Sequence, residues 1–228
     1  MGKRVAVLLA GCGAYDGSEI HEASAALVHL SRAGAEVTVF APDVAQHHVV
    51  DHASGKEQSG ETERNVLRES SRIARGAARD LAQLRVADFD ALLVPGGFGV
   101  AKNLSSWASE GASCSLLPGV EAALRAFREA DKPVALCCIA PVLAARLFPG
   151  CELTVGGDSE QGGRFPYAGT AAAIRELGCT HVCTDVGEAH VDAKLKIVTT
   201  SAFMCATAPI HHVYDGVGVM VQEMLKLA

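Results

Sequence analysis

The chain has 228 residues, of which 49% are hydrophobic, 20% are charged and 23 are glycines. This composition excludes a disordered chain, a collagen-like fibre and a coiled coil. The formal net charge of −6 argues against a nucleic-acid-binding face and against binding to an anionic membrane surface. The length suits one large α/β domain, so we expect a single domain over residues 1–228. No apolar run is long enough to predict a membrane span.

Short aliphatic runs alternate with longer helical stretches along the chain. We predict strands over residues 5–9, 37–40, 91–94, 134–137, 152–155 and 195–199. We predict helices over residues 18–33, 62–84, 119–130, 140–147, 170–177 and 209–226. Strands and helices that alternate in this way predict a mostly parallel sheet with helices on both faces. Two polar or glycine-rich stretches, 43–61 and 156–169, are predicted to be loops.

Ligands of open parallel sheets bind beyond the carboxyl ends of the strands, so the residues after each strand are the first candidates. The first strand leads into Gly11 and Gly13, but Asp16 stands where a dinucleotide fingerprint needs its third glycine. We therefore predict no cofactor. The eight cysteines include no CxxC pair, which predicts free thiols in a reducing compartment and no metal site.

The third predicted strand is followed by Pro95-Gly96-Gly97. Adjacent glycines let the backbone come close to another group and direct N–H groups into a site, as in an oxyanion hole. The alternative interpretation is a tight strand-to-helix turn without a chemical role. The sequence leaves both interpretations open.

The fourth predicted strand leads into Cys137-Cys138, and Pro141 suits the first turn of the next helix. A thiol at this junction has the shape of a nucleophile elbow, and we expect the helix dipole to lower its pKa. Cys137 continues the strand, whereas Cys138 falls at the turn. Cys138 is therefore the candidate nucleophile, with a small core residue as the alternative interpretation.

The first predicted helix supplies a candidate partner for the thiol. Asp16 is expected to be its N-cap, which places Glu19 close to a capping box. Glu22 lies at the edge of the apolar face of this helix, where its carboxyl group could meet Cys138. A protonated Glu22 would lower the pKa of the thiol and an ionised one would raise it. The alternative is a surface glutamate.

The sequence places no histidine beside Cys138. His47, His48 and His52 lie in the polar stretch 43–61 and are expected to be solvated rather than to bind a metal. No complete Cys-His-acid triad can be assigned to the other histidines that we considered, His181, His190, His211 and His212.

Several motifs together resemble those of the enhancing-lycopene-biosynthesis family, and the resemblance spans essentially the whole chain. The motifs are Gly11-Cys12-Gly13 with Tyr15-Asp16-Gly17, Glu19-Ile20-His21-Glu22-Ala23, Arg64-Asn65-Val66-Leu67, Pro95-Gly96-Gly97-Phe98-Gly99 with Ala101-Lys102-Asn103-Leu104, and Cys138-Ile139-Ala140-Pro141. The stretch Phe165-Pro166-Tyr167-Ala168-Gly169-Thr170 is similar to the vertebrate branch, the glutamine amidotransferase-like class I domain-containing proteins of mitochondria. This family belongs to the superfamily of PfpI and the Parkinson-associated protein deglycase.

The resemblance implies one glutamine amidotransferase-like domain of the PfpI type, a flavodoxin-like three-layer α/β sandwich. It implies Cys138 as the elbow cysteine and Glu22 as its partner. The superfamily's histidine usually follows the next strand, but here residues 152–155 lead into Gly156 and Gly157. Glutaminase activity is therefore not expected. The resemblance also implies a homodimer and a mitochondrial location, with a cytoplasmic location as the alternative.

The leading hypothesis is weak glyoxalase-like or deglycase-like thiol chemistry on a small aldehyde or dicarbonyl, such as methylglyoxal. Cys138 would add to the carbonyl group, Glu22 would relay protons, and the backbone N–H groups of Gly97 and Ile139 would hold the developing oxyanion. The alternative is a non-catalytic redox-sensing or binding protein.

The loop over residues 156–169 combines glycines with aromatic residues. Such loops can close over a site. We expect it to cover the pocket through Phe165 or Tyr167.

Overall fold

The computed structural model describes residues 2–58 and 64–228. Its main sheet has the strand order β10-β11-β7-β6-β1-β2-β5, and only the β10–β11 pair is antiparallel within it. The strands of this sheet are β1 (Arg4–Leu8), β2 (Glu36–Ala41), β5 (Arg79–Asp80), β6 (Ala91–Val94), β7 (Val134–Cys137), β10 (His190–Asp192) and β11 (Ile197–Thr200). Two small sheets pair β3 (Val50–Asp51) with β4 (Lys56–Glu57) and β8 (Glu152–Leu153) with β9 (Thr180–His181). The predicted mostly parallel sheet is confirmed.

Helices cover both faces of this sheet. The helices of the described residues are α1 (Ile20–Arg32), α2 (Val66–Ile73), α3 (Phe98–Lys102), α4 (Trp107–Glu110), α5 (Pro118–Glu129), α6 (Pro141–Leu147), α7 (Gly169–Glu176) and α8 (Ile210–Leu227). Short 3-10 helices lie at Leu81–Gln83, Val86–Asp88, Gly111–Ser113 and Ala202–Met204.

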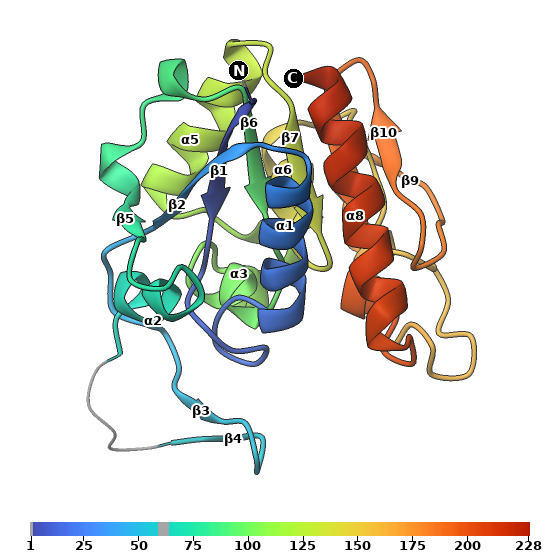
Figure 1. The fold of residues 1–228 in the computed structure, drawn as a ribbon. Helices are drawn as coiled ribbons and strands as arrows, with labels where there is room; N and C mark the ends of the chain where they lie inside the picture. Colours follow the sequence, from blue (N-terminus) through green and yellow to red (C-terminus); the bar gives the residue numbers. More distant parts are fainter. Residues whose placement is uncertain (1, 59–63) are drawn as a thin grey trace.

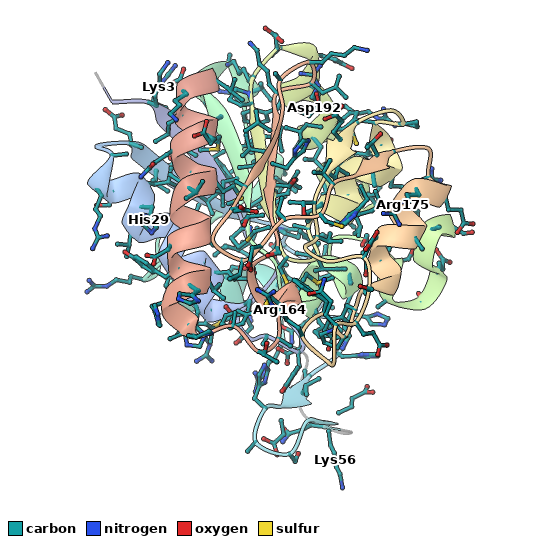
Figure 2. All side chains as sticks on the ribbon, turned by 90° about the vertical axis from the view of Figure 1, so that its right-hand side faces the viewer. Lys3, His29, Lys56, Arg164, Arg175 and Asp192 are labelled. Atoms are coloured by element: carbon teal, nitrogen blue, oxygen red, sulfur yellow. The ribbon has the colours of Figure 1, made fainter. Side chains whose placement is uncertain are left out.

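Three layers result from this arrangement. Figure 1 shows α1 and α8 side by side in front of the sheet, with α5 behind it against β6 and β7. Figure 2, turned by 90°, has α8 on the left and α7, which carries Arg175, on the right. The two front helices approach closely at His29, because Gly218 of α8 leaves room for its ring. The flavodoxin-like three-layer sandwich is confirmed.

The middle of the sheet forms the core. Residues 5–8 of β1 and 91–94 of β6 have no exposed surface. A strand that is buried on both faces needs a continuous apolar run, and these two runs are what the sequence contains at these positions. Both strands therefore lie within a residue of their predicted bounds.

The region after β2 differs from its prediction in two ways. The helix expected over 62–84 is limited to α2, because Arg75 and Gly76 adopt positive φ angles of 53° and 87° and the chain then enters β5. The stretch 43–61 contains the β3–β4 hairpin, which projects from the body in Figure 1. Residues 59–63, which belong to these two predictions, lie outside the described residues.

The loop after β1 also differs from its prediction. Asp16 does not cap α1; the cap is Glu19, and Asp16 instead accepts a hydrogen bond from the N–H of Val50 in the hairpin at 2.8 Å. Asn103 fixes the same loop from the other side, since its Nδ2 donates to the carbonyl groups of Ala10 (2.8 Å) and Asp16 (2.9 Å). The loop is thereby held at the carboxyl end of β1.

Candidate active site

The elbow predicted after β7 is present. Cys137 ends the strand and is fully buried, and Cys138 follows at the turn before α6. Cys138 has a φ of 60°, in the left-handed region that residues with a side chain rarely adopt. Its N–H donates to the carbonyl group of Thr200 in β11 at 3.0 Å, which fixes the turn against the neighbouring strand. A strained turn between a strand and a helix is the geometry of a nucleophile elbow.

Glu22 lies in the first turn of α1 and has no exposed surface, so the interpretation as a surface glutamate is wrong. The helix begins there because the carboxylate of Glu19 accepts a hydrogen bond from the N–H of Glu22 at 2.7 Å. The Oε2 of Glu22 accepts from the N–H of Gly96 at 2.9 Å, and its Oε1 accepts from the N–H of Phe203 at 3.2 Å. The thiol of Cys137 also donates to Oε2, at 3.6 Å.

Two glycines bring the carboxyl group and the elbow together. A Cβ on Gly96 would lie 2.6 Å from Oε2 of Glu22 and 2.9 Å from Sγ of Cys138. The carboxyl group and the thiol therefore lie against the same short piece of backbone. Gly97 has a φ of 100°, and a Cβ there would lie 2.3 Å from the backbone nitrogen of Glu19. Close approach, rather than turn formation alone, requires glycine at both positions.

Burial dominates the electrostatics of the site. It raises the pKa of Glu22 to about 7, and the nearby charge of Glu19 adds to this effect. Burial, followed by the charge of Glu22, raises the pKa of the Cys138 thiol well above its usual range. The expectation that the helix dipole lowers this pKa is therefore wrong, because withdrawal from water outweighs the field of a helix with only seven residues. The resting thiol keeps its proton, and Glu22 titrates near neutral pH.

Two backbone donors surround the sulfur. The N–H groups of Gly97 and Ile139 hydrogen-bond to Cys138 and lower its pKa, although less than burial raises it. Donors in this position stabilise negative charge on the sulfur or on an oxygen next to it. The structure thus brings together Cys138, Glu22, Gly97 and Ile139, the residues chosen from the sequence. Their chemical roles remain predictions.

Cys138 lines a cavity of about 730 Å³. Five aromatic side chains contribute to its wall: Tyr15, Phe98, Trp107, Tyr167 and Phe203. They come from the loop after β1, from α3, from α4, from the glycine-rich loop before α7 and from the segment after β11. No single stretch of sequence predicts this cavity, because its wall consists of segments that are far apart in the chain.

The glycine-rich loop reaches the cavity through Tyr167 and not through Phe165. Tyr167 lines the cavity, and its ring meets that of Phe98 edge to face with 5.9 Å between the centroids. Phe165 is buried, with its ring packed against Gly156 and Gly157. These two glycines stand where the resemblance leads one to look for a histidine.

His21 also lines the cavity, and sequence reasoning did not select it. Its Nδ1 lies 2.9 Å from Oε1 of Glu19, and its ring lies edge-on to that of Phe203 with 6.0 Å between the centroids. Its position next to Glu22, in the first turn of α1, is the signal that could have identified it.

The histidines of the 43–61 stretch lie in the β3–β4 hairpin or just before it. His52 is exposed, as expected, and it also accepts a hydrogen bond from the N–H of Tyr15 at 3.1 Å and stacks on its ring. Within residues 2–58 and 64–228, no group of three or more His, Cys, Asp or Glu side chains is placed to hold a metal ion.

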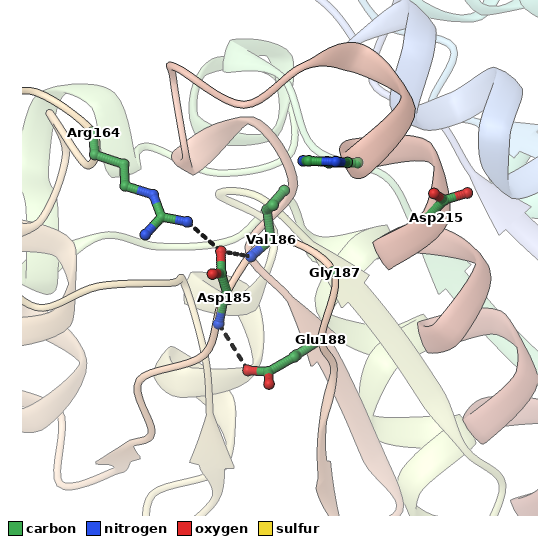
Figure 3. Close-up of a pocket in the computed structure, with 7 residues that line it drawn as sticks. Arg164, Asp185, Val186, Gly187, Glu188 and Asp215 are labelled. Carbon is green, nitrogen blue, oxygen red and sulfur yellow. Dashed lines mark hydrogen bonds and ion pairs between the residues drawn. The ribbon is translucent and has the colours of Figure 1, made fainter.

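A second hollow, of about 410 Å³, lies between α8 and the segment before β10 (Figure 3). Arg164 pairs there with Asp185, whose N–H donates to the carboxylate of Glu188 at 2.9 Å, and Asp215 of α8 lies across from them. Of its charged side chains, Arg164 and Asp185 pair with each other, and no cysteine is among the described residues that line it. The first cavity is therefore the stronger candidate for covalent chemistry.

Known proteins identify the family of this chain. The human glutamine amidotransferase-like class 1 domain-containing protein 3, mitochondrial, is 59% identical over 224 residues, which cover 98% of this chain and 83% of the human protein. The chain belongs to this family. No general family model matches it. The family predicted from the sequence motifs is confirmed.

Solved structures agree with the fold. The isoprenoid biosynthesis protein with an amidotransferase-like domain from Ehrlichia chaffeensis has a TM-score of 0.87 and 35% identity, over 99% of both chains. DJ-1beta of Drosophila melanogaster has a TM-score of 0.56 and 19% identity, over 99% of this chain and 97% of that one, and shares the fold. No helix within the described residues is long and apolar enough to cross a membrane.

Proposed function

We propose that the protein is a thiol-dependent enzyme with glyoxalase-like or deglycase-like activity on reactive carbonyl compounds. One observation carries the proposal: the buried carboxyl group of Glu22 and the thiol of Cys138 meet against Gly96, at a strained elbow that opens into a cavity. The amidotransferase-like fold of the family supports a site of this type.

The first step is addition of the thiol to an aldehyde. Because the thiol of Cys138 rests protonated, it needs a base, and Glu22 has a pKa of about 7 that suits this task near neutral pH. As the S–C bond forms and the C=O π bond breaks, Glu22 takes the S–H proton and passes it to the carbonyl oxygen. The N–H groups of Gly97 and Ile139 hold this oxygen while it is charged. The product is a hemithioacetal.

The second step moves hydrogen within a 2-oxoaldehyde. Glu22 removes the proton from the former aldehyde carbon and returns a proton to the neighbouring carbon, through an enediol. The hemithioacetal thereby becomes the thioester of a 2-hydroxy acid. Water then cleaves the thioester and restores the thiol of Cys138. One 2-oxoaldehyde and one water give one 2-hydroxy acid, so no external oxidant or reductant is needed.

Lactate formation from methylglyoxal tests the proposal. Cys138→Ala is expected to reduce the rate to the uncatalysed background, and Glu22→Gln to reduce it about a hundredfold or more, because acid–base catalysis contributes about that much. Cys183→Ala, which removes an exposed thiol, is the matched control and is expected to keep the rate. Undiminished lactate formation by Cys138→Ala would contradict the proposal.

The alternative of a redox-sensing protein has less support. Peroxides react with a thiolate that is already formed, and burial keeps the resting thiol of Cys138 protonated, whereas in the proposed step Glu22 takes the proton only as the S–C bond forms. We also propose a mitochondrial location, because the name of the human relative states one. A homodimer is a further proposal, which light scattering on the purified protein tests.

A further inference from the structure

The cavity at Cys138 is larger than a small dicarbonyl requires. Its volume of about 730 Å³ falls in the range of cavities that enclose drug-sized ligands, whereas methylglyoxal has only about five heavy atoms. A substrate that filled only the floor of this cavity would leave most of the wall uncovered. The volume therefore points to a carbonyl compound with a sizeable substituent.

The wall shows which kind of substituent fits. The chain has one Trp, three Tyr and seven Phe. The Trp, two of the Tyr and two of the Phe line the cavity. Tyr15, Phe98 and Tyr167 remain 45%, 37% and 47% exposed at its mouth. Large apolar side chains that stay exposed around a concave site mark a ligand-binding surface. An apolar group on the substrate would cover them.

The charged residues of the wall are already paired within the protein. The carboxylate of Glu19 accepts from the N–H of Glu22 and lies 2.9 Å from Nδ1 of His21. The ammonium group of Lys102 donates to the carbonyl group of Tyr15 at 2.9 Å. These charges hold the wall together, so apolar contact supplies the recognition of the substituent.

We propose that the substrate is a 2-oxoaldehyde that carries an aromatic ring or a medium-length alkyl chain. The inference rests on the proposed function for its chemical step. Sγ of Cys138 adds to the aldehyde carbon, as above, and the net reaction again combines the 2-oxoaldehyde with one water to give a 2-hydroxy acid. The substituent takes no part in the reaction and is held between the aromatic rings of the wall, Trp107 among them.

A homologous series of substrates tests the inference. We expect kcat/KM to rise about fourfold for each methylene added to methylglyoxal, until the chain fills the cavity, because each buried methylene contributes about 0.8 kcal/mol. Phenylglyoxal is expected to exceed methylglyoxal by at least tenfold. Trp107→Ala should reduce this preference, whereas Tyr214→Ala, which removes an aromatic side chain of α8 outside the cavity, should retain it. Equal kcat/KM values along the series would overturn the inference.

A binding measurement separates this inference from the proposed function. Trp107 is the only Trp of the chain and lines the cavity, so its fluorescence reports ligand binding without turnover. In the Cys138→Ala variant, cyclohexyl methyl ketone is expected to change this fluorescence at concentrations at least tenfold lower than acetone. This result without turnover of any 2-oxoaldehyde would refute the proposed chemistry but retain the apolar site. Turnover of methylglyoxal, with no preference between the two ketones, would refute the apolar site but retain the chemistry.

Discussion

Replacing Glu22 by Gln should change how the stability of the protein depends on pH. The carboxyl group is fully buried, and its pKa rises from 4.5 to about 7 on folding. The folded state therefore binds this proton more tightly than the unfolded state. The stabilisation is fully present below about pH 4.5 and is lost as the pH rises to about 7.

The size of this effect follows from the shift. One pKa unit corresponds to about 1.4 kcal/mol, so ionisation of Glu22 should lower the free energy of unfolding by about 3 kcal/mol across this interval. Gln cannot ionise, so the free energy of unfolding of the variant should lack this dependence on pH. The variant also loses an acceptor for the N–H of Gly96 or Phe203. This loss lowers the free energy of unfolding by an amount that does not vary with pH.

Urea unfolding at a series of pH values between about 5 and about 8 measures the effect. The difference between the wild type and Glu22→Gln is the quantity of interest, because all other side chains are the same in the two proteins. Glu129→Gln, which removes an exposed carboxylate from the end of α5, is the matched control. Parallel pH curves for the wild type and Glu22→Gln would refute the raised pKa and with it the role of Glu22 as a base near neutral pH.

Three further predictions concern the same site. Gly96→Ala should cost about 1–3 kcal/mol in thermal or urea unfolding and abolish lactate formation, because its Cβ would lie 2.3 Å from that of Cys138; a fully active variant would contradict the close packing. Among Cys183, Cys138 and Cys137, iodoacetamide should modify the exposed Cys183 first, Cys138 next and the fully buried Cys137 last, as measured by peptide mapping. Modification of Cys137 before Cys138 would place the elbow one residue earlier. Tyr167→Ala should raise KM while changing the free energy of unfolding by no more than about 0.5 kcal/mol, and an unchanged KM would remove the loop from the site.

The sequence predicts the sheet well because its central strands are buried on both faces. Runs such as 5–8 and 91–94 are continuous and apolar, and few other structures explain them. The end of α2 is harder to predict, since Arg75 continues a helical pattern although it and Gly76 both adopt positive φ angles. Asp16 is predicted to cap α1 because Asp is a common N-cap residue, but in the structure its carboxylate binds the N–H of Val50 in the hairpin instead.

The residues of the site can be predicted from the sequence, but their burial and their pKa values cannot. The position of Cys138 follows from the end of a strand and the start of a helix, which are local features. The direction of its pKa shift depends on how deeply the thiol and Glu22 are buried, which only tertiary packing determines. The same is true of His21 and Trp107, whose place in the cavity depends on segments that meet across the sheet edge.

The most direct test of the central claim is to stop the reaction of the wild type with methylglyoxal by acid during turnover and to map the modified peptides. The account predicts a lactoyl thioester on Cys138 that hydroxylamine removes, and its absence from Glu22→Gln. Consumption of methylglyoxal while the Cys138 peptide stays unmodified, with adducts confined to exposed residues such as Cys183, would contradict it.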